Sequence, residues 1–243
     1  MQSKGMESTL NPPDLRELPV LLRGEPEPLT AWVRQWSPFR LALHLSVIVL
    51  GSAAFGAAMG AWRAPQQAVY TALKFPLVIL LTTLGNGLLN GMLAPLLGLD
   101  LRFRQSLLAV LLSYSITAAI LGAFSPIVFF LVWNTAPMAA HSAAAQTGHN
   151  FLLIAEVVII AGAGMAGNLR LLELLRRLAG RADVAQRVLF AWLAGNLLLG
   201  SQLSWILRPF VGSPNLPVEF FRPTALQGNF FESIWQIIRH AFS

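Results

Sequence analysis

Two charged residues stand alone inside long apolar stretches, and they are the side chains best placed to do chemistry. Lys74 and Glu156 have no other Asp, Glu, Lys or Arg in the segments around them. An ionisable group at membrane depth is a candidate functional site, because burying a charge in hydrocarbon is costly. Three interpretations are open: a structural ion pair, a proton or ion path, or a Lys74 that extends to the interface while Glu156 faces the wet edge of a bundle.

Two asparagines form a second candidate polar site. Asn86 and Asn90 are four residues apart in an apolar run, so in a helix they project from one face. A side-chain amide is costly against lipid, and we expect both to face protein or water. They indicate either interhelical hydrogen bonds or a solute pathway, and Asn168 and Asn196 could join them.

Glycines spaced for close contact recur along the chain. The sequence GAGMAG, with Gly162, Gly164 and Gly167, has the spacing of a dinucleotide-binding fingerprint, but that motif needs a strand before it and a helix that starts at its glycines. Here it lies inside an apolar helical run, so we predict helix packing instead. The same prediction covers Ser52, Gly56 and Gly60, which would suit a homodimer, and Gly87 with Gly91.

No constellation of residues indicates catalysis or metal binding. The chain has no cysteine, and His141 and His149 lie eight residues apart with no Cys, Asp or Glu between them. Ser113 and Ser115 flank Tyr114 without a base and an orienting group nearby in the sequence. We therefore predict no enzyme, no cofactor and no metal site.

The composition indicates a membrane protein. Of 243 residues, 55% are hydrophobic and 12% charged, and the mean hydropathy is +0.61, whereas soluble domains carry about 25% charged residues. The net charge of +6 could suggest nucleic acid, but the arginines lie in short segments that flank apolar runs. We predict an all-α, polytopic helical bundle that contacts the lipid bilayer and binds no nucleic acid.

Five apolar runs are long enough to cross a bilayer, which takes about twenty helical residues. They cover residues 39–62, 73–97, 103–124, 151–169 and 188–207. The third run continues past Pro126 to Trp133, and because proline disrupts helices we expect an end or a kink there. Residues 127–133 would then protrude, lie at the outer interface or form a re-entrant piece. The domains are an N-terminal segment (1–38), a five-span domain (39–207) and a tail (208–243).

Arginine placement predicts the orientation, because positive residues near span ends stay in the cytoplasm. They gather in the N-terminal segment, in the link after the second span and in the link after the fourth. We expect a cytoplasmic N-terminus and an external C-terminus, although the tail carries Arg208, Arg222 and Arg239. The frequent Arg, Ala and Leu suggest a GC-rich bacterium, and hence an inner membrane.

The tail ends in an amphipathic segment, residues 229–242. Asn229 is a plausible N-cap, and the apolar residues recur at three- and four-residue steps: Phe230, Phe231, Ile234, Trp235 and Ile238. This face could lie on a membrane surface, on the protein's own loops or on a partner subunit.

Residues 98–126, GLDLRFRQSLLAVLLSYSITAAILGAFSP, resemble the loop and third span of the Yip (Ypt-interacting protein) domain family. Arg104, Gln105, Leu107 and the pair Tyr114–Ser115 carry the match, while the proline usual after that pair is replaced by Ile116 and Thr117. The resemblance implies five spans, a cytoplasmic N-terminal region and a protein that works through partners or by shaping bilayers.

Two functions follow as expectations. The leading one is a non-enzymatic scaffold or assembly subunit that forms a homo-oligomer or binds another membrane protein through its helices and tail. The alternative is a transporter or channel for a small solute or ion that uses Glu156, Lys74 and the face of Asn86 and Asn90.

Overall fold

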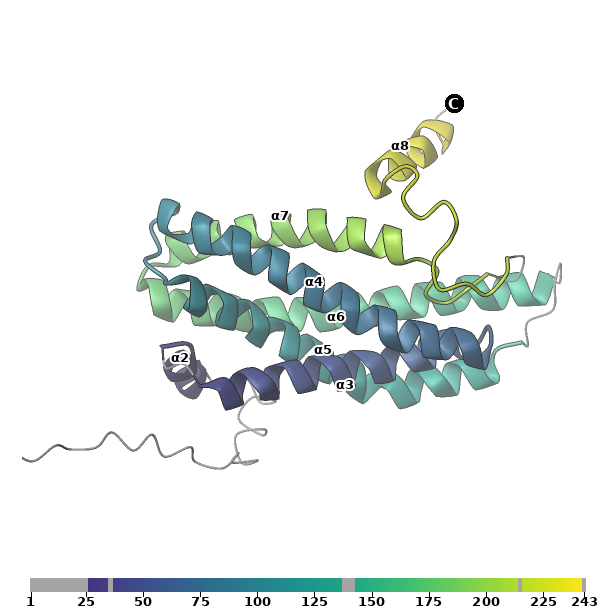
Figure 1. Ribbon diagram of the computed structural model, residues 1–243, viewed down its shortest axis with the longest axis horizontal. Coiled ribbons are helices and arrows are strands. Elements are labelled where there is room, and N and C mark those ends of the chain that lie inside the picture. The colour runs from purple at the N-terminus through teal and green to yellow at the C-terminus, as the bar shows by residue number, and fades with distance from the viewer. Residues whose placement is uncertain (1–25, 35–36, 137–142, 214–215, 242–243) are drawn as a thin grey trace, which may run out of the picture.

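The computed structural model describes residues 26–34, 37–136, 143–213 and 216–241 (Figure 1). These residues form helices and connecting segments, with no strand among them, which confirms the predicted all-α fold. The helices are α2 (Pro26–Arg34), α3 (Pro38–Gly60), α4 (Pro65–Leu96), α5 (Phe103–Asn134), α6 (Ala143–Ala179), α7 (Ala182–Leu207) and α8 (Phe230–Ala241).

Within the described residues, five helices, α3 to α7, are long and apolar enough to cross a membrane. Even the shortest, α3 with 23 residues, exceeds a hydrocarbon core of about 30 Å at 1.5 Å per residue. Figure 1 shows all five running side by side along the long axis of the molecule. The chain is therefore a multi-pass membrane protein, as its composition predicts.

The expected end of the helix at Pro126 is wrong, because α5 continues through it to Asn134. Proline has no N–H to give to the carbonyl four residues earlier, here that of Gly122. The hydroxyl of Ser125 donates to this carbonyl over 2.7 Å, so the acceptor that proline leaves free is satisfied and the helix can continue. Residues 127–133 extend α5 by two further turns.

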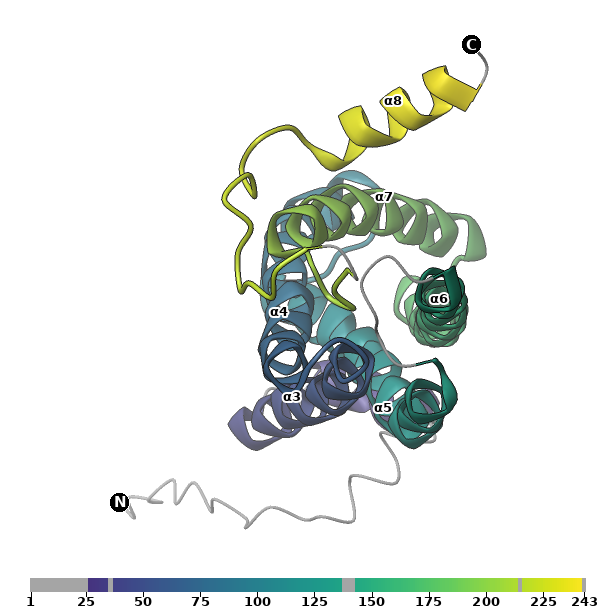
Figure 2. The ribbon, with the colours of Figure 1, turned by 90° about the vertical axis from the view of Figure 1, so that its right-hand side faces the viewer.

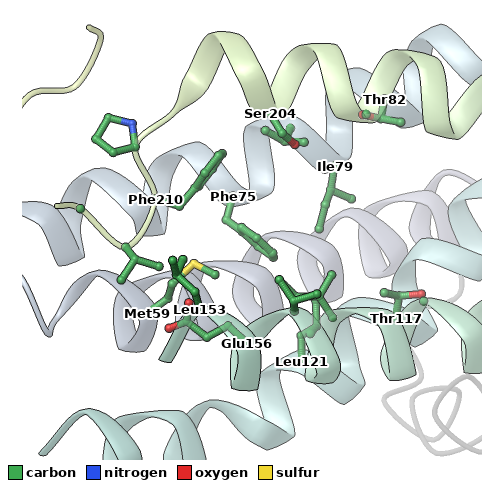
Figure 3. Close-up of a pocket in the computed structure, with 18 of the residues that line it drawn as sticks. Met59, Phe75, Ile79, Thr82, Thr117, Leu121, Leu153, Glu156, Ser204 and Phe210 are labelled. Carbon is green, nitrogen blue, oxygen red and sulfur yellow. The ribbon is translucent and has the colours of Figure 1, made fainter. Parts of the chain in front are cut away.

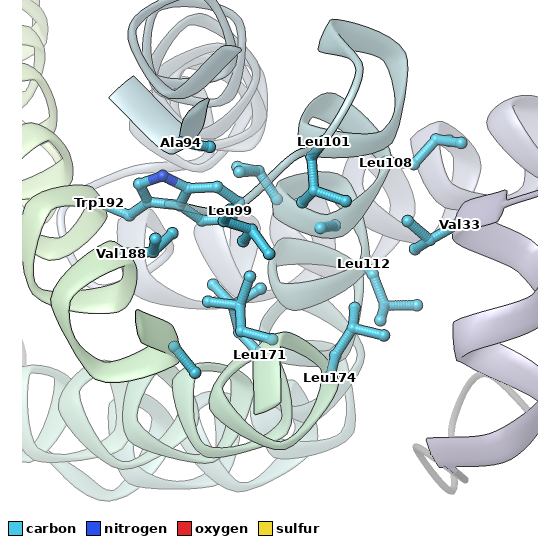
Figure 4. Packing of buried hydrophobic residues seen from close by; sticks show 14 of the residues in the cluster. Val33, Ala94, Leu99, Leu101, Leu108, Leu112, Leu171, Leu174, Val188 and Trp192 are labelled. Atoms are coloured by element: carbon cyan, nitrogen blue, oxygen red, sulfur yellow. The ribbon is translucent and has the colours of Figure 1, made fainter. Parts of the chain in front are cut away.

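One end of the bundle, which we call the basic end, contains the links 97–102 and 180–181. Arg181 and Arg187 both bind Asp183 there. The buried residues at this end form one apolar cluster built from α2, α4, α5, α6 and α7 (Figure 4). Trp192 of α7 is fully buried in it, beside Ala94 and Val188. The helix α2, which the sequence does not predict, buries Leu29, Trp32 and Val33 in the same cluster.

Most of the predicted glycine contacts lie between helices of this one chain. A side chain at Gly56 or Gly60 would collide with the backbone of Thr71 or Gln67 in α4, at 2.6 and 2.5 Å. Ser52 is fully buried on the same helix, α3. Gly87 and Gly91 of α4 pack on side chains of α5. The glycines of α3 that would suit a homodimer are therefore used inside the protomer.

Of the three glycines of GAGMAG, one packs on another helix of this chain and two do not. Gly167 lies against Ser113 and Thr117 of α5. A Cβ at Gly162 or Gly164 would meet no heavy atom within 4 Å, because these two glycines lie on other sides of α6. The motif lies inside α6, with no strand before it in the described residues.

The opposite end, which we call the tail end, holds the link 61–64 and the segment that follows α7. From Arg208 this segment folds back over the ends of α4 and α7, and α8 then runs across the direction of the bundle (Figures 1 and 2). Asn229 is the N-cap, since its Oδ1 accepts the N–H of Glu232 over 2.8 Å. Phe231, Ile234 and Trp235 are exposed, and the side chain of Ile238 lies outside the described part.

Candidate functional site

A cavity of about 690 Å³ lies inside the bundle toward the tail end. Its walls come from α3, α4, α5, α6, α7 and the tail, as the close-up in Figure 3 shows. Most of the lining is apolar, with Met59, Phe75, Leu121 and Phe210 among the larger side chains. The volume falls within the range of small-molecule sites, roughly 300–1,000 Å³.

Glu156 is the acidic residue of this lining. It lies near the middle of α6 and is 2% exposed. Neither carboxyl oxygen has a hydrogen-bond partner among the described residues. A buried polar group without a partner is costly. Besides Glu156, the lining holds two further unpartnered polar atoms, the Thr82 hydroxyl and the His149 Nδ1, but Glu156 is the carboxyl that offers an unfilled contact to an N–H or O–H donor.

Lys74 does not pair with Glu156, although both are buried at the same end of the bundle. Its Nζ donates to the backbone oxygen of Pro209 over 3.0 Å and to that of Glu219 over 3.4 Å. The ammonium also lies 5.0 Å from the ring centre of Phe220. Lys74 therefore binds the tail, an arrangement that the three interpretations from the sequence did not include.

Lys74 belongs to a row of three buried polar residues on α4 that hold the tail, and we call this row the clasp. Gln67 and Thr71 are its other members, spaced four and three residues apart so that all three share one helix face. The amide of Gln67 donates to Pro209 and Phe210 oxygens over 3.0 and 2.7 Å, and the hydroxyl of Thr71 donates to Phe210 over 2.6 Å. These bonds fix the backbone of Phe210, and its side chain lies in the cavity with its ring centre 6.1 Å from that of Phe75.

Asn86 joins three helices. Its Nδ2 donates to the side-chain oxygen of Asn196 on α7 and to the backbone oxygen of Trp192, the latter over 3.3 Å. The same Asn196 oxygen accepts the hydroxyl of Tyr114 on α5 over 2.8 Å. These bonds are the interhelical contacts expected of Asn86, and they also place Tyr114 and Asn196 in the cavity wall.

The other predicted asparagines lie outside this network. Asn90 is fully buried, and its amide has no hydrogen-bond partner among the described residues. Asn168 donates to the Gly164 oxygen of its own helix over 2.8 Å.

Comparison of the chain with protein-family models finds no match. Comparisons with curated proteins and with solved structures find none either. The resemblance of residues 98–126 to the Yip family therefore stays a prediction, and the chemistry of the cavity has to be judged from its own residues.

The cavity is suited to binding a largely apolar molecule with one polar end. Besides Glu156, its lining contains the charged Arg222 of the tail and the imidazole of His149, which stacks on Trp62 at 5.3 Å. No group of three His, Cys, Asp or Glu in the described residues could hold a metal ion, and His141 lies outside those residues. Apolar walls with a few fixed polar groups are typical of ligand sites.

Among the buried polar residues that sequence reasoning missed, three form hydrogen bonds with other elements of the fold. Gln67 and Thr71 precede Lys74 at helical spacing, and this pattern could have revealed the clasp. The third is His44 of α3, whose Nδ1 lies 3.0 Å from the hydroxyl of Ser115 on α5. The tail's attachment to the clasp has no sequence signal, since the tail contributes backbone oxygens to it.

Proposed function

We propose that this membrane protein binds an amphipathic molecule inside its bundle, with Glu156 as the contact for the molecule's polar end. The ligand is mainly apolar and carries an ammonium or another N–H or O–H donor. This proposal belongs to the class of solute binding and transport and involves no chemical reaction on the ligand.

The observation that carries the proposal is the buried, unpartnered carboxyl of Glu156 in a cavity of about 690 Å³. A donor on the ligand would supply the missing hydrogen bond, which for a charged group contributes about 1.5–3 kcal/mol. The apolar lining would supply the remaining affinity through the hydrophobic effect.

Thermal unfolding of the protein in nanodiscs tests this proposal. Octylamine is expected to raise the midpoint of unfolding in a saturable way, and octanoate, which has a similar chain but an anionic end, is expected to raise it much less. The variant Glu156→Gln should lose the preference for the amine. Equal responses of the wild type to the two compounds would contradict the proposal.

A scaffold role is the second candidate, and α8 is the observation that favours it. Phe231, Ile234 and Trp235 are exposed on a helix that stands apart from the bundle. Its start is held by a 3.3 Å bond from the Phe230 N–H to Gln202 of α7. A partner subunit could cover this apolar face.

Native mass spectrometry of the complex, purified by a tag on the N-terminus, tests the scaffold role. A foreign subunit in fixed ratio that is lost in Trp235→Ser would support it, with Phe190→Ser, exposed on α7, as the control. A species of one chain with bound small molecules would favour ligand binding instead.

The proposed location is a bacterial inner membrane, with the basic end in the cytoplasm and the tail end outside. The clustered arginines of the links support this orientation. A reporter fused after Ser243 that is active only in the cytoplasm would overturn it.

A further inference from the structure

We infer that the ligand is a membrane lipid with an amine-bearing headgroup, and that it reaches Glu156 sideways from the bilayer between α6 and α7. This inference rests on the proposed binding function, because it assigns the ligand class and the route for the same cavity. It draws on the divergence of two helices, the exposure of one lining residue and a groove that adjoins the cavity.

Helices α6 and α7 touch near their connection and separate toward the tail end. Close to residues 180–181 they are joined by buried side chains such as Leu171, Leu175 and Val188. Figure 2 looks along the bundle from the tail end, and there the near end of α7 lies well away from the near end of α6. The two helices that border the cavity on this side therefore diverge toward the tail end.

Two residues of α6 show that the cavity reaches the outer surface at this wall. Val157 lines the cavity and is nevertheless 62% exposed. Gly164 lines the cavity and also a second space of about 490 Å³ between α6 and α7. A Cβ at Gly164 would meet no heavy atom within 4 Å, so the junction of the two spaces is open.

The second space is an apolar groove on the bilayer-facing side of the two helices. It is lined by Ala161, Gly164, Met165, Asn168, Leu169, Leu172, Leu189 and Leu193. The one side-chain amide among them, that of Asn168, is bonded to its own helix. A groove of this kind within a membrane span fits an acyl chain, because hydrocarbon is what surrounds it.

Together the cavity and the groove match the two parts of a lipid. The acyl chain would occupy the groove and pass Gly164, and the headgroup would lie in the cavity with its ammonium at Glu156. Arg222 in the same lining is suited to the phosphate. Phosphatidylethanolamine has both charges, whereas phosphatidylglycerol lacks the ammonium.

A photoactivatable phosphatidylethanolamine with a diazirine in one acyl chain tests this in nanodiscs. In the wild type we expect the label on α6 and α7 residues of the groove, such as Met165 and Leu193. Gly164→Phe should fill the junction without a clash, because its Cβ position is open. The label should then fall about tenfold, which corresponds to ~1.4 kcal/mol.

Gly162→Phe is the matched control. Gly162 is exposed on the same helix, also has no atom within 4 Å of its Cβ position, and is not part of either lining. Labelling of this variant should equal that of the wild type. Labelling by the corresponding phosphatidylglycerol should be weaker in all three proteins.

Octylamine separates the failure of this inference from the failure of the proposed function. It is short enough to fit the cavity without the groove, so its effect on the wild type reports on the cavity alone. If octylamine binds and the lipid label is unchanged in Gly164→Phe, the lateral route is wrong and the binding function stands. If octylamine does not bind the wild type, the proposed function itself fails.

Discussion

The two ends of the bundle differ in how closely their buried side chains pack. At the basic end five helices enclose an apolar cluster in which Trp192 is 0% exposed. At the tail end the helices surround a cavity, and the carboxyl of Glu156 stays without a partner among the described residues. Asn90, Ser106 and the indole N–H of Trp192 also lack a partner among those residues, but they do not line that cavity. The basic end thus has the packing that stabilises a fold, while the tail end keeps space beside an unpartnered carboxyl.

At the tail end, the segment that follows α7 is nevertheless fixed to the bundle by hydrogen bonds. Gln67, Thr71 and Lys74 bind backbone oxygens of the tail, which lies more than a hundred residues further along the sequence. Polar residues of this end therefore differ: each clasp residue donates to the tail, although the Oε1 of Gln67 has no partner among the described residues, and neither oxygen of Glu156 has one. This contrast distinguishes the structural clasp from the proposed ligand site.

The largest effect is expected at the basic end, from Trp192→Ala. Removing a fully buried aromatic side chain leaves a cavity and lowers the free energy of unfolding by about 3–5 kcal/mol. Titration of unfolding in mixed micelles measures it. Phe190→Ala, on the same helix but 76% exposed, is the control and should cost far less; equal losses would mean that the burial of Trp192 does not stabilise the basic end.

The next effect is expected at the clasp, from Lys74→Met. The Glu219 oxygen loses its Lys74 donor, while the Pro209 oxygen keeps the one from Gln67, and an acceptor left without a partner costs about 1–3 kcal/mol. Hydrogen exchange should accelerate at the backbone amides around Phe210 and Phe220, while α2 and the basic end stay protected. Leu73→Met, at a 59% exposed neighbour, is the control, and unchanged exchange in Lys74→Met would disprove the role of the clasp.

The architecture could be predicted because it depends on local composition and periodicity. The five spans and the helix after Asn229 follow from apolar run length and from three- and four-residue spacing. Lys74 and Glu156 could also be singled out, since isolated charges in apolar runs are conspicuous. The partners of Lys74 could not be predicted, because they are the backbone oxygens of Pro209 and Glu219, and a carbonyl has no signature in the sequence.

The cavity could not be predicted either, because it depends on which way each helix faces. Gly162 and Gly167 belong to one motif, yet five residues of α-helix turn them about 140° apart. One therefore packs on α5 and the other is exposed. Likewise, the Gly122 carbonyl that Pro126 leaves without a backbone donor is bonded by the Ser125 hydroxyl, a contact that no sequence pattern shows.

A smaller effect at the tail end is expected from Ser125→Ala. It removes the donor to the Gly122 oxygen beside Pro126 and should lower the free energy of unfolding by about 0.5–1.5 kcal/mol. Ser201→Ala is the control, because the Ser201 hydroxyl bonds to Leu197, an oxygen that the α-helix already supplies with a backbone donor. Equal stability of the two variants would show that the hydroxyl does not support the helix at Pro126.

The smallest effect on stability is expected from Glu156→Gln, and its size decides between a structural and a functional carboxyl. A structural carboxyl has partners in the protein, so its replacement costs stability, whereas a carboxyl kept for a ligand stabilises the empty protein little. We expect the unfolding free energy of the ligand-free protein to change by less than about 0.5 kcal/mol, or to rise. Asn86→Leu, which removes a donor shared with Asn196 and Trp192, is the matched buried control and should destabilise. A loss in Glu156→Gln as large as that in Asn86→Leu would mean that Glu156 belongs to the protein's own packing, and the comparison between the two ends would no longer hold.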